Sequence, residues 1–212
     1  MSAHRPRKSR EAPPAPQGRA AKHDPGGQTR SALPKGVRHR GMFSRCGFYR
    51  PMLRRWTIEG GGRFPNRYIA FIGMNPSTAD NFASDPTVSR GWNTARRLGY
   101  TAMVQLNVAD IRGTRPAALS SFNKPVSSGM NLPFILKFAL HADKVVACWG
   151  KLTGDLAREA RQVFAMLQKN LPADKPIYCF GTTKKGWPRH FRGLCQPALI
   201  KTHEPTGGGR WT

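Results

Sequence analysis

The organisation of the chain is indicated by one stretch, Tyr68-Ile69-Ala70-Phe71-Ile72-Gly73-Met74-Asn75-Pro76-Ser77-Thr78-Ala79-Asp80. Its first five residues are β-branched, aromatic or small, which is typical of a buried strand, and glycine and proline then interrupt the pattern. The loop that follows should lie at the carboxyl edge of the sheet, where open α/β sheets keep their ligand crevices. We therefore expect functional groups among its polar residues, which are Asn75, Ser77, Thr78 and Asp80.

Strand and helix patterns alternate along the rest of the chain. Strands are predicted at 48–58, 67–72, 101–108, 144–149, 176–180 and 198–201, and helices at 85–98, 131–141 and 155–169. This alternation predicts a three-layer α/β sandwich with a mostly parallel central sheet. The first two strands should form an antiparallel hairpin, with Arg50, Arg54 and Arg55 on its solvent face.

Composition divides the chain near residue 40. Residues 1–40 contain six Pro, four Gly and ten Lys or Arg against two acidic residues, so they are predicted to form a disordered basic arm. Residues 41–203 are long enough for a single α/β domain, and residues 204–212 should form a flexible tail.

The chain carries a formal net charge of +24, and most of this excess lies outside the arm. Such a surplus favours a polyanionic partner, most simply nucleic acid bound through phosphate contacts and counterion release. The alternative is a solvated basic surface without a specific partner.

Cysteine usage and hydropathy indicate a cytoplasmic protein. The four cysteines are widely separated and form no C-x-x-C pair, so neither a zinc site nor a disulfide framework is predicted, and Cys148 and Cys179 should be core residues. The chain has no apolar run of membrane-spanning length and no secretory signal pattern, which predicts that no membrane is a partner.

Parallel strands collect their polar ends at one edge, so the loops after residues 72, 107, 149 and 180 should face one crevice. Candidate phosphate contacts on these loops and on the helix 85–98 are Ser77, Thr78, Arg90, Arg112, Arg115, Lys151, Lys184, Lys185 and Arg189. Asn107 ends the strand 101–108 region at this edge, and His190 lies in the loop after residue 180.

Residues 48–192 resemble a bacterial and phage family, domain of unknown function 1643. The motifs that carry this resemblance are Asn75-Pro76-Ser77-Thr78-Ala79-Asp80, Asp85-Pro86-Thr87, Trp149-Gly150 and Pro188-Arg189-His190. The family name implies no activity.

A more distant resemblance is to the uracil-DNA glycosylase-like superfamily, in which one branch has a Gly-Ile-Asn-Pro motif similar to Gly73-Met74-Asn75-Pro76. The resemblance extends to an asparagine that closes a later strand (Asn107), a Trp-Gly segment (Trp149-Gly150) and a histidine in a final loop (His190). It implies the fold of these enzymes, DNA rather than RNA as the polymer, and neither a cofactor nor a metal.

The resemblance also implies roles for individual side chains. Asn75 would position the water that attacks the sugar, Asn107 would read the flipped base, and His190 would stabilise the charge that develops on the leaving base. Because an asparagine amide is not a general base, Asp80 or Asp85 would have to supply one. Phe82 would stack on the base; Trp92 is a second candidate, but its pattern favours the core.

Each of these residues also has a simpler interpretation. Asn75 could cap a turn, Asp85 could be a helix N-cap, and Asn107 could satisfy backbone groups at the end of a strand. His190 could be an ordinary exposed loop residue.

Three hypotheses remain open from the sequence. The first is a metal-independent base-excision enzyme, and the second is a nucleic-acid-binding protein without catalysis. The third is a magnesium-dependent nucleotide or phosphodiester hydrolase, which would require Asp80, Asp85 and Asp110 to converge. The sequence gives no indication of the oligomeric state.

Overall fold

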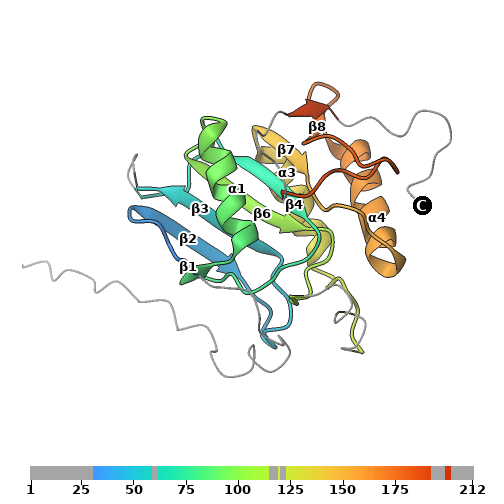
Figure 1. The fold of residues 1–212 in the computed structure, drawn as a ribbon, viewed down its shortest axis with the longest axis horizontal. Coiled ribbons are helices and arrows are strands. Elements are labelled where there is room, and N and C mark those ends of the chain that lie inside the picture. The colour runs from blue at the N-terminus through green and yellow to red at the C-terminus, as the bar shows by residue number, and fades with distance from the viewer. Residues whose placement is uncertain (1–30, 59–61, 115–118, 120–122, 192–198, 202–212) are drawn as a thin grey trace, which may run out of the picture.

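The structure, a computed structural model, describes residues 31–58, 62–114, 119, 123–191 and 199–201 (Figure 1). Its strands are β1 (Ser31–Ala32), β2 (Val37–Met42), β3 (Met52–Thr57), β4 (Ile69–Gly73), β5 (Ala83–Ser84), β6 (Ala102–Asn107), β7 (Lys144–Ala147), β8 (Ile177–Cys179) and β9 (Ile200–Lys201). Its helices are α1 (Pro86–Arg97), α3 (Asn131–His141) and α4 (Gly154–Asn170). The predicted helices and most of the predicted strands are thus present at the expected places.

The main sheet has seven strands in the order β2-β3-β6-β4-β7-β8-β9. The four strands β6, β4, β7 and β8 are mutually parallel, whereas β2-β3, β3-β6 and β8-β9 pair antiparallel. The sheet is therefore mixed rather than mostly parallel as predicted, because antiparallel strands flank the parallel centre on both sides. All five residues of β4 are buried, as expected of a strand with neighbours on both sides.

The predicted hairpin between residues 48–58 and 67–72 is also wrong. β3 pairs with β2 on one side and with β6 on the other, so β6 separates β3 from β4. β2 was not predicted from the sequence; intermediate and exposed residues alternate in it from Val37 to Arg40. Residues 31–40, which were assigned to the disordered arm, thus contain β1 and most of β2, while residues 1–30 and 204–212 lie outside the described residues.

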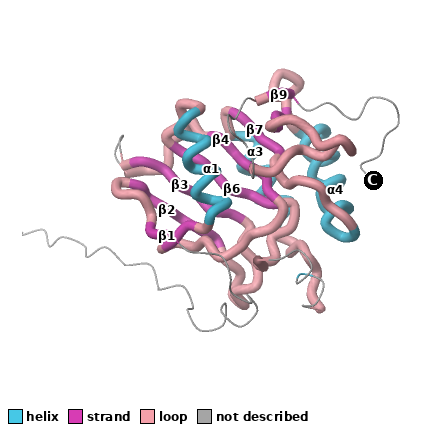
Figure 2. The backbone as a smooth tube through the Cα atoms, viewed as in Figure 1, coloured by secondary structure: helices cyan, strands magenta, loops and turns pink. Residues whose placement is uncertain are grey.

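Helices cover both faces of the sheet, which confirms the three-layer sandwich (Figure 2). α1 packs on one face through Val88, Trp92 and Ala95, and Trp92 is therefore a core residue. α3 and α4 pack on the other face, where Ile135 and Val163 join the larger of the two hydrophobic clusters. Of the helices in the described ranges, none is both long and apolar enough to cross a membrane.

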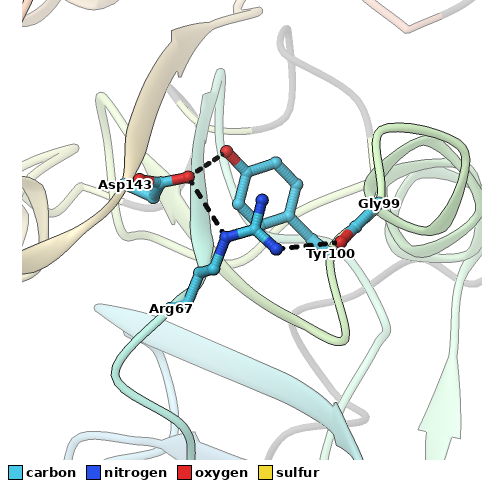
Figure 3. Close-up of polar contacts among 4 residues, drawn as sticks. All are labelled: Arg67, Gly99, Tyr100 and Asp143. Atoms are coloured by element: carbon cyan, nitrogen blue, oxygen red, sulfur yellow. Dashed lines mark hydrogen bonds and ion pairs between the residues drawn. The ribbon is translucent and has the colours of Figure 1, made fainter.

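The amino edge of the parallel strands is closed by a polar cluster of Arg67, Tyr100 and Asp143 (Figure 3). The Tyr100 hydroxyl donates to Asp143 Oδ2 at 2.5 Å, and Arg67 Nε lies 3.7 Å from the same oxygen. Burial, together with the hydrogen bond and charge of Asp143, raises the pKa of Tyr100. These residues lie just before β4, β6 and β7, so the cluster joins the amino ends of the three strands.

Candidate functional site

A cavity of about 350 Å³ lies at the carboxyl ends of β4, β6 and β7. It is lined by Gly73, Met74, Asn75, Ser77, Thr87, Asn107, Gly113, Thr114, Trp149, Gly150, Lys151 and His190. Asn75, Asn107 and His190 therefore share one cavity, as expected from the loops at this sheet edge. Its volume falls within the usual range of small-molecule sites.

The strand order explains why the cavity forms here. From β4 the chain crosses through α1 on one face to β6, and it then reaches β7, on the other side of β4, after α3 on the opposite face. The connections diverge at the end of β4, and this topological switch point is where open α/β sheets bind ligands.

Asn75 joins two loops of the cavity wall. Its Nδ2 donates hydrogen bonds to the carbonyl oxygens of Gly113 at 2.8 Å and Pro76 at 3.1 Å. These two acceptors use both amide hydrogens, so the side-chain oxygen is the atom that remains to accept a hydrogen bond. The predicted turn-capping role and a role in ligand binding are therefore compatible.

Asn107 lies opposite Gly73 in the β4-β6 ladder and is only 3 % exposed. Its Nδ2 is buried and has no hydrogen-bond partner among the described residues. A Cβ on Gly73 would lie 2.9 Å from Asn107 Oδ1 and 3.0 Å from Gln105 Nε2, so glycine is needed for the two amides to lie where they do. The backbone oxygen of Asn107 accepts from Asn131 Nδ2 at 3.2 Å, which holds the end of β6 against α3.

His190 reaches the cavity because its loop is tied to the loop after β7. The Gly150 N–H donates to the Pro188 carbonyl at 2.9 Å. Gly150 has a φ of +77°, and a Cβ at this position would lie 3.5 Å from His190 Cβ. The left-handed backbone therefore favours glycine here, whereas the contact with His190 would be an ordinary van der Waals one.

Two arginines of the β3 region brace the loop that carries the candidate motif. Arg50 Nη1 donates to the Ala79 carbonyl, and Arg55 Nη2 donates to the carbonyls of Asp80 at 2.8 Å and Ala83 at 3.2 Å. Both side chains are 1 % exposed, so the prediction that they lie on a solvent face is wrong. Burial is the largest effect on both side chains, and it lowers the pKa of Arg50 to about 9 and that of Arg55 to about 10.

The candidate carboxylates have structural partners. Asp85 is the N-cap of α1 and accepts from the N–H groups of Ala79 and Val88, at 3.2 and 2.8 Å. Asp80 accepts from two N–H groups of its own turn, those of Phe82 and Ala83. Neither carboxylate lines the cavity, which leaves the proposed general-base role without support from their positions.

The magnesium hypothesis required Asp80, Asp85 and Asp110 to converge. Asp110 instead accepts from Ser128 N and Ser128 Oγ, and burial raises its pKa. In the part of the chain that the structure describes, no group of three or more His, Cys, Asp or Glu side chains could hold a metal ion. The expected convergence is therefore absent.

Only some of the predicted phosphate contacts lie at the cavity. Ser77 and Lys151 line the cavity, whereas Thr78, Arg90, Lys184, Lys185 and Arg189 do not. Arg90, Lys184, Lys185 and Arg189 have exposed side chains, and Arg189 Nε donates to the Thr182 carbonyl at 3.0 Å.

Arg112 is 8 % exposed and lies over the Phe43 ring, and its Nη1 donates to the Gly47 carbonyl at 3.3 Å. The predicted phosphate contact is therefore corrected: Arg112 is a buried side chain that holds neighbouring segments together. Phe82 is 60 % exposed beside His39 and is not part of the cavity wall. Arg115 lies outside the described residues.

Thr87, Gly113 and Thr114 line the cavity although they were not predicted as site residues. Thr87 is the second residue of α1, and a helix that follows a parallel strand starts at the carboxyl edge of the sheet. Gly113 and Thr114 are held there because the Gly113 N–H donates to the Pro76 carbonyl at 2.9 Å. The Asp85-Pro86 helix start was a usable signal for Thr87, whereas only the tertiary contact reveals Thr114.

Comparison with known families gives a match over residues 50–190 to the family described as "Protein of unknown function (DUF1643)". The chain belongs to this family. Every residue of the cavity wall lies within the matched range. No curated protein matches the chain, and no solved structure does.

Proposed function

We propose that this DUF1643 protein is a base-excision enzyme, a nucleic-acid N-glycosylase that hydrolyses the bond between a base and its sugar. The observation that carries the proposal is that Asn75, Asn107 and His190, which are far apart in sequence, line one cavity. These are the three positions for which the resemblance to uracil-DNA glycosylase-like enzymes implies functional roles.

Base excision places positive charge on the sugar and negative charge on the leaving base. Asn75 supports the attack step, because its side-chain oxygen is the atom left to accept a hydrogen bond from water once Nδ2 has bound two carbonyls. The water oxygen bonds to the anomeric carbon, the electron pair of the glycosidic bond leaves with the base, and the water proton passes to solvent.

Asn107 and His190 supply groups for the base. The buried Asn107 Nδ2, which lacks a partner among the described residues, would donate a hydrogen bond to an acceptor on the base edge. His190 would donate to a base oxygen as that oxygen becomes negative. The described residues of the cavity wall include no carboxylate that would repel an anionic leaving group.

The rest of the molecule supports a nucleic-acid substrate, with DNA as the proposed polymer. The formal net charge is +24, and Lys151 stands at the cavity itself. A target base must leave the stack to enter a pocket of this kind, so single-stranded or mismatched sites are the favoured substrates.

The test is to incubate the protein with single- and double-stranded oligonucleotides bearing uracil or a panel of modified bases, with and without EDTA, and to count abasic sites. Product that persists in EDTA is expected, with Asn75→Ala and His190→Ala each reducing the rate by about 100-fold or more. His141→Ala and Asn66→Ala, which alter exposed residues outside the cavity, are matched controls and should retain full activity.

The same experiment distinguishes the other hypotheses. Salt-sensitive binding without abasic product from any base would replace the proposal with a non-catalytic nucleic-acid-binding protein. Strand or nucleotide hydrolysis that EDTA abolishes would indicate a metal-dependent hydrolase.

A further inference from the structure

The cavity wall is rich in hydrogen-bond donors beyond the three residues used for base excision. Ser77, Thr87 and Thr114 line it with hydroxyl side chains, and Lys151 is the one lysine among its described residues. None of the twelve lining residues in the described part of the chain is acidic. Such a wall suits a ligand that carries negative charge.

Ser77 and Thr114 are the central pair. The hydrogen bond from Gly113 N to the Pro76 carbonyl, at 2.9 Å, holds their two loops together one residue before each hydroxyl. The Ser77 side chain lines the cavity and is only 9 % exposed. Both hydroxyl oxygens are buried without a hydrogen-bond partner among the described residues, which is costly unless a ligand supplies one.

The start of α1 adds a second favourable feature. Thr87 follows Pro86 at the beginning of this 12-residue helix and lines the cavity. Helix geometry leaves the Thr87 N–H without an intrahelical acceptor, and the positive end of the helix dipole favours an anion. The carboxylate of Asp85 is already bound by two backbone N–H groups and does not line the cavity.

We propose that Ser77, Thr87, Thr114 and Lys151 form a phosphate subsite inside the cavity, so that the ligand is a nucleotide held by both its base and its phosphate. The inference rests on the proposed function in taking the ligand to be a nucleotide. The phosphate belongs either to a free mononucleotide or to the target nucleotide of a strand, and its chemistry at the subsite is the same.

Isothermal titration calorimetry at fixed ionic strength tests the subsite with dUMP, deoxyuridine and inorganic phosphate. We expect dUMP to bind about ten-fold or more tightly than deoxyuridine, and inorganic phosphate to compete with dUMP. The double variant Ser77→Ala/Thr114→Val should weaken dUMP binding by about ten-fold or more while leaving deoxyuridine binding unchanged.

Thr78→Val is the matched control. Its hydroxyl is also buried and without a partner among the described residues, but it does not line the cavity, so this substitution should leave dUMP binding unchanged. Thermal unfolding of each variant verifies that the fold is kept. Should a double variant fail to fold, Lys151→Gln, at an exposed position of the wall, provides the same comparison.

Three results would overturn the subsite. They are equal affinities for dUMP and deoxyuridine, no binding of either dUMP or inorganic phosphate, and equal weakening of both nucleoside and nucleotide in a folded double variant. A trinucleotide with a central deoxyuridine that binds more tightly than dUMP assigns the phosphate to a strand. If dUMP binds more tightly than the trinucleotide, the phosphate belongs to a free nucleotide. Either result supports the subsite.

The outcome is separable from that of base excision. The subsite alone would be refuted if abasic product forms and the Ser77→Ala/Thr114→Val variant binds dUMP as tightly as wild type. Phosphate-dependent binding without excision of any base would refute the proposed reaction alone.

Discussion

The side-chain amide of Asn75 donates a hydrogen bond to the Gly113 carbonyl at 2.8 Å, which joins the loop after β4 to the loop after β6. The same nitrogen also donates to the Pro76 carbonyl. Asn75 therefore organises the cavity wall as well as contributing to it, and its substitution should affect both stability and ligand binding.

Replacement of Asn75 by aspartate is expected to destabilise the protein more than replacement by alanine. A carboxylate would face two carbonyl oxygens, whereas alanine loses the hydrogen bonds without adding repulsion. We expect a loss of about 1–2 kcal/mol for Asn75→Ala and a larger loss for Asn75→Asp at pH 7, measured by urea unfolding. The difference should shrink near pH 4 as the new carboxyl gains a proton, and an equal loss for both variants at pH 7 would contradict the proposed amide orientation.

Gly73→Ala tests the close approach of β4 to the amides of β6. The new Cβ would meet Asn107 Oδ1 at 2.9 Å, so the amide must shift, at an expected cost of about 1–3 kcal/mol in unfolding free energy. Gly129→Ala is the control, because a Cβ there meets nothing within 4 Å and its φ is not positive. Similar stabilities of the two variants would show that Asn107 is not held against Gly73.

Asp85→Ala should lower stability by about 1–2 kcal/mol, since Asp85 caps α1 and also binds the Ala79 N–H. Asp85→Asn keeps a side-chain oxygen for one of these donors and should be milder. Calorimetric melting and the excision rate should be measured on the same samples. A variant with unchanged melting temperature but greatly reduced turnover would restore a catalytic role for Asp85.

Tyr68 provides a test at alkaline pH. Burial raises its pKa from its usual value near 10 to about 12, and its hydroxyl donates to the Phe138 carbonyl at 2.9 Å. Between these pH values the folded protein keeps a proton that the unfolded chain loses, so the stabilising contribution is present below pH 10 and is lost as the pH rises through 12.

The unfolding free energies of wild type and Tyr68→Phe, measured by urea titration from pH 8 to 12, should therefore approach each other. The advantage of wild type over the variant should fall by about 2 kcal/mol across this range, because phenylalanine does not ionise. A constant difference would mean that the hydroxyl titrates as it does in the unfolded chain.

Two truncations test the boundary of the N-terminal segment. Deletion of residues 1–40 removes four of the six residues that pair β2 with β3, and it should lower the melting temperature markedly. Deletion of residues 1–30 leaves β1 and β2 intact and should preserve cooperative unfolding while weakening oligonucleotide binding at low salt. Equal melting temperatures would contradict a stabilising role for β2.

Much of the fold and part of the site could be predicted from local patterns. The apolar run before Gly73, the Asp85-Pro86 helix start and the amphipathic pattern of α4 are short-range features, and each produced the expected element. The parallel centre of the sheet then required the loops after β4, β6 and β7 to meet, which brought Asn75 and Asn107 together.

The partners of each strand and the surroundings of each charged side chain were decided only by the tertiary structure. β6 lies between β3 and β4 in the sheet although β3 and β4 are consecutive strands along the chain. Arg50, Arg55 and Arg112 are buried although their sequence pattern suggested a basic surface. Thr114 joined the cavity only through the contact between Gly113 and Pro76. Local sequence encodes the preference of each segment, but long-range packing determines which carbonyl oxygens are available to a buried guanidinium and which loop lies against another.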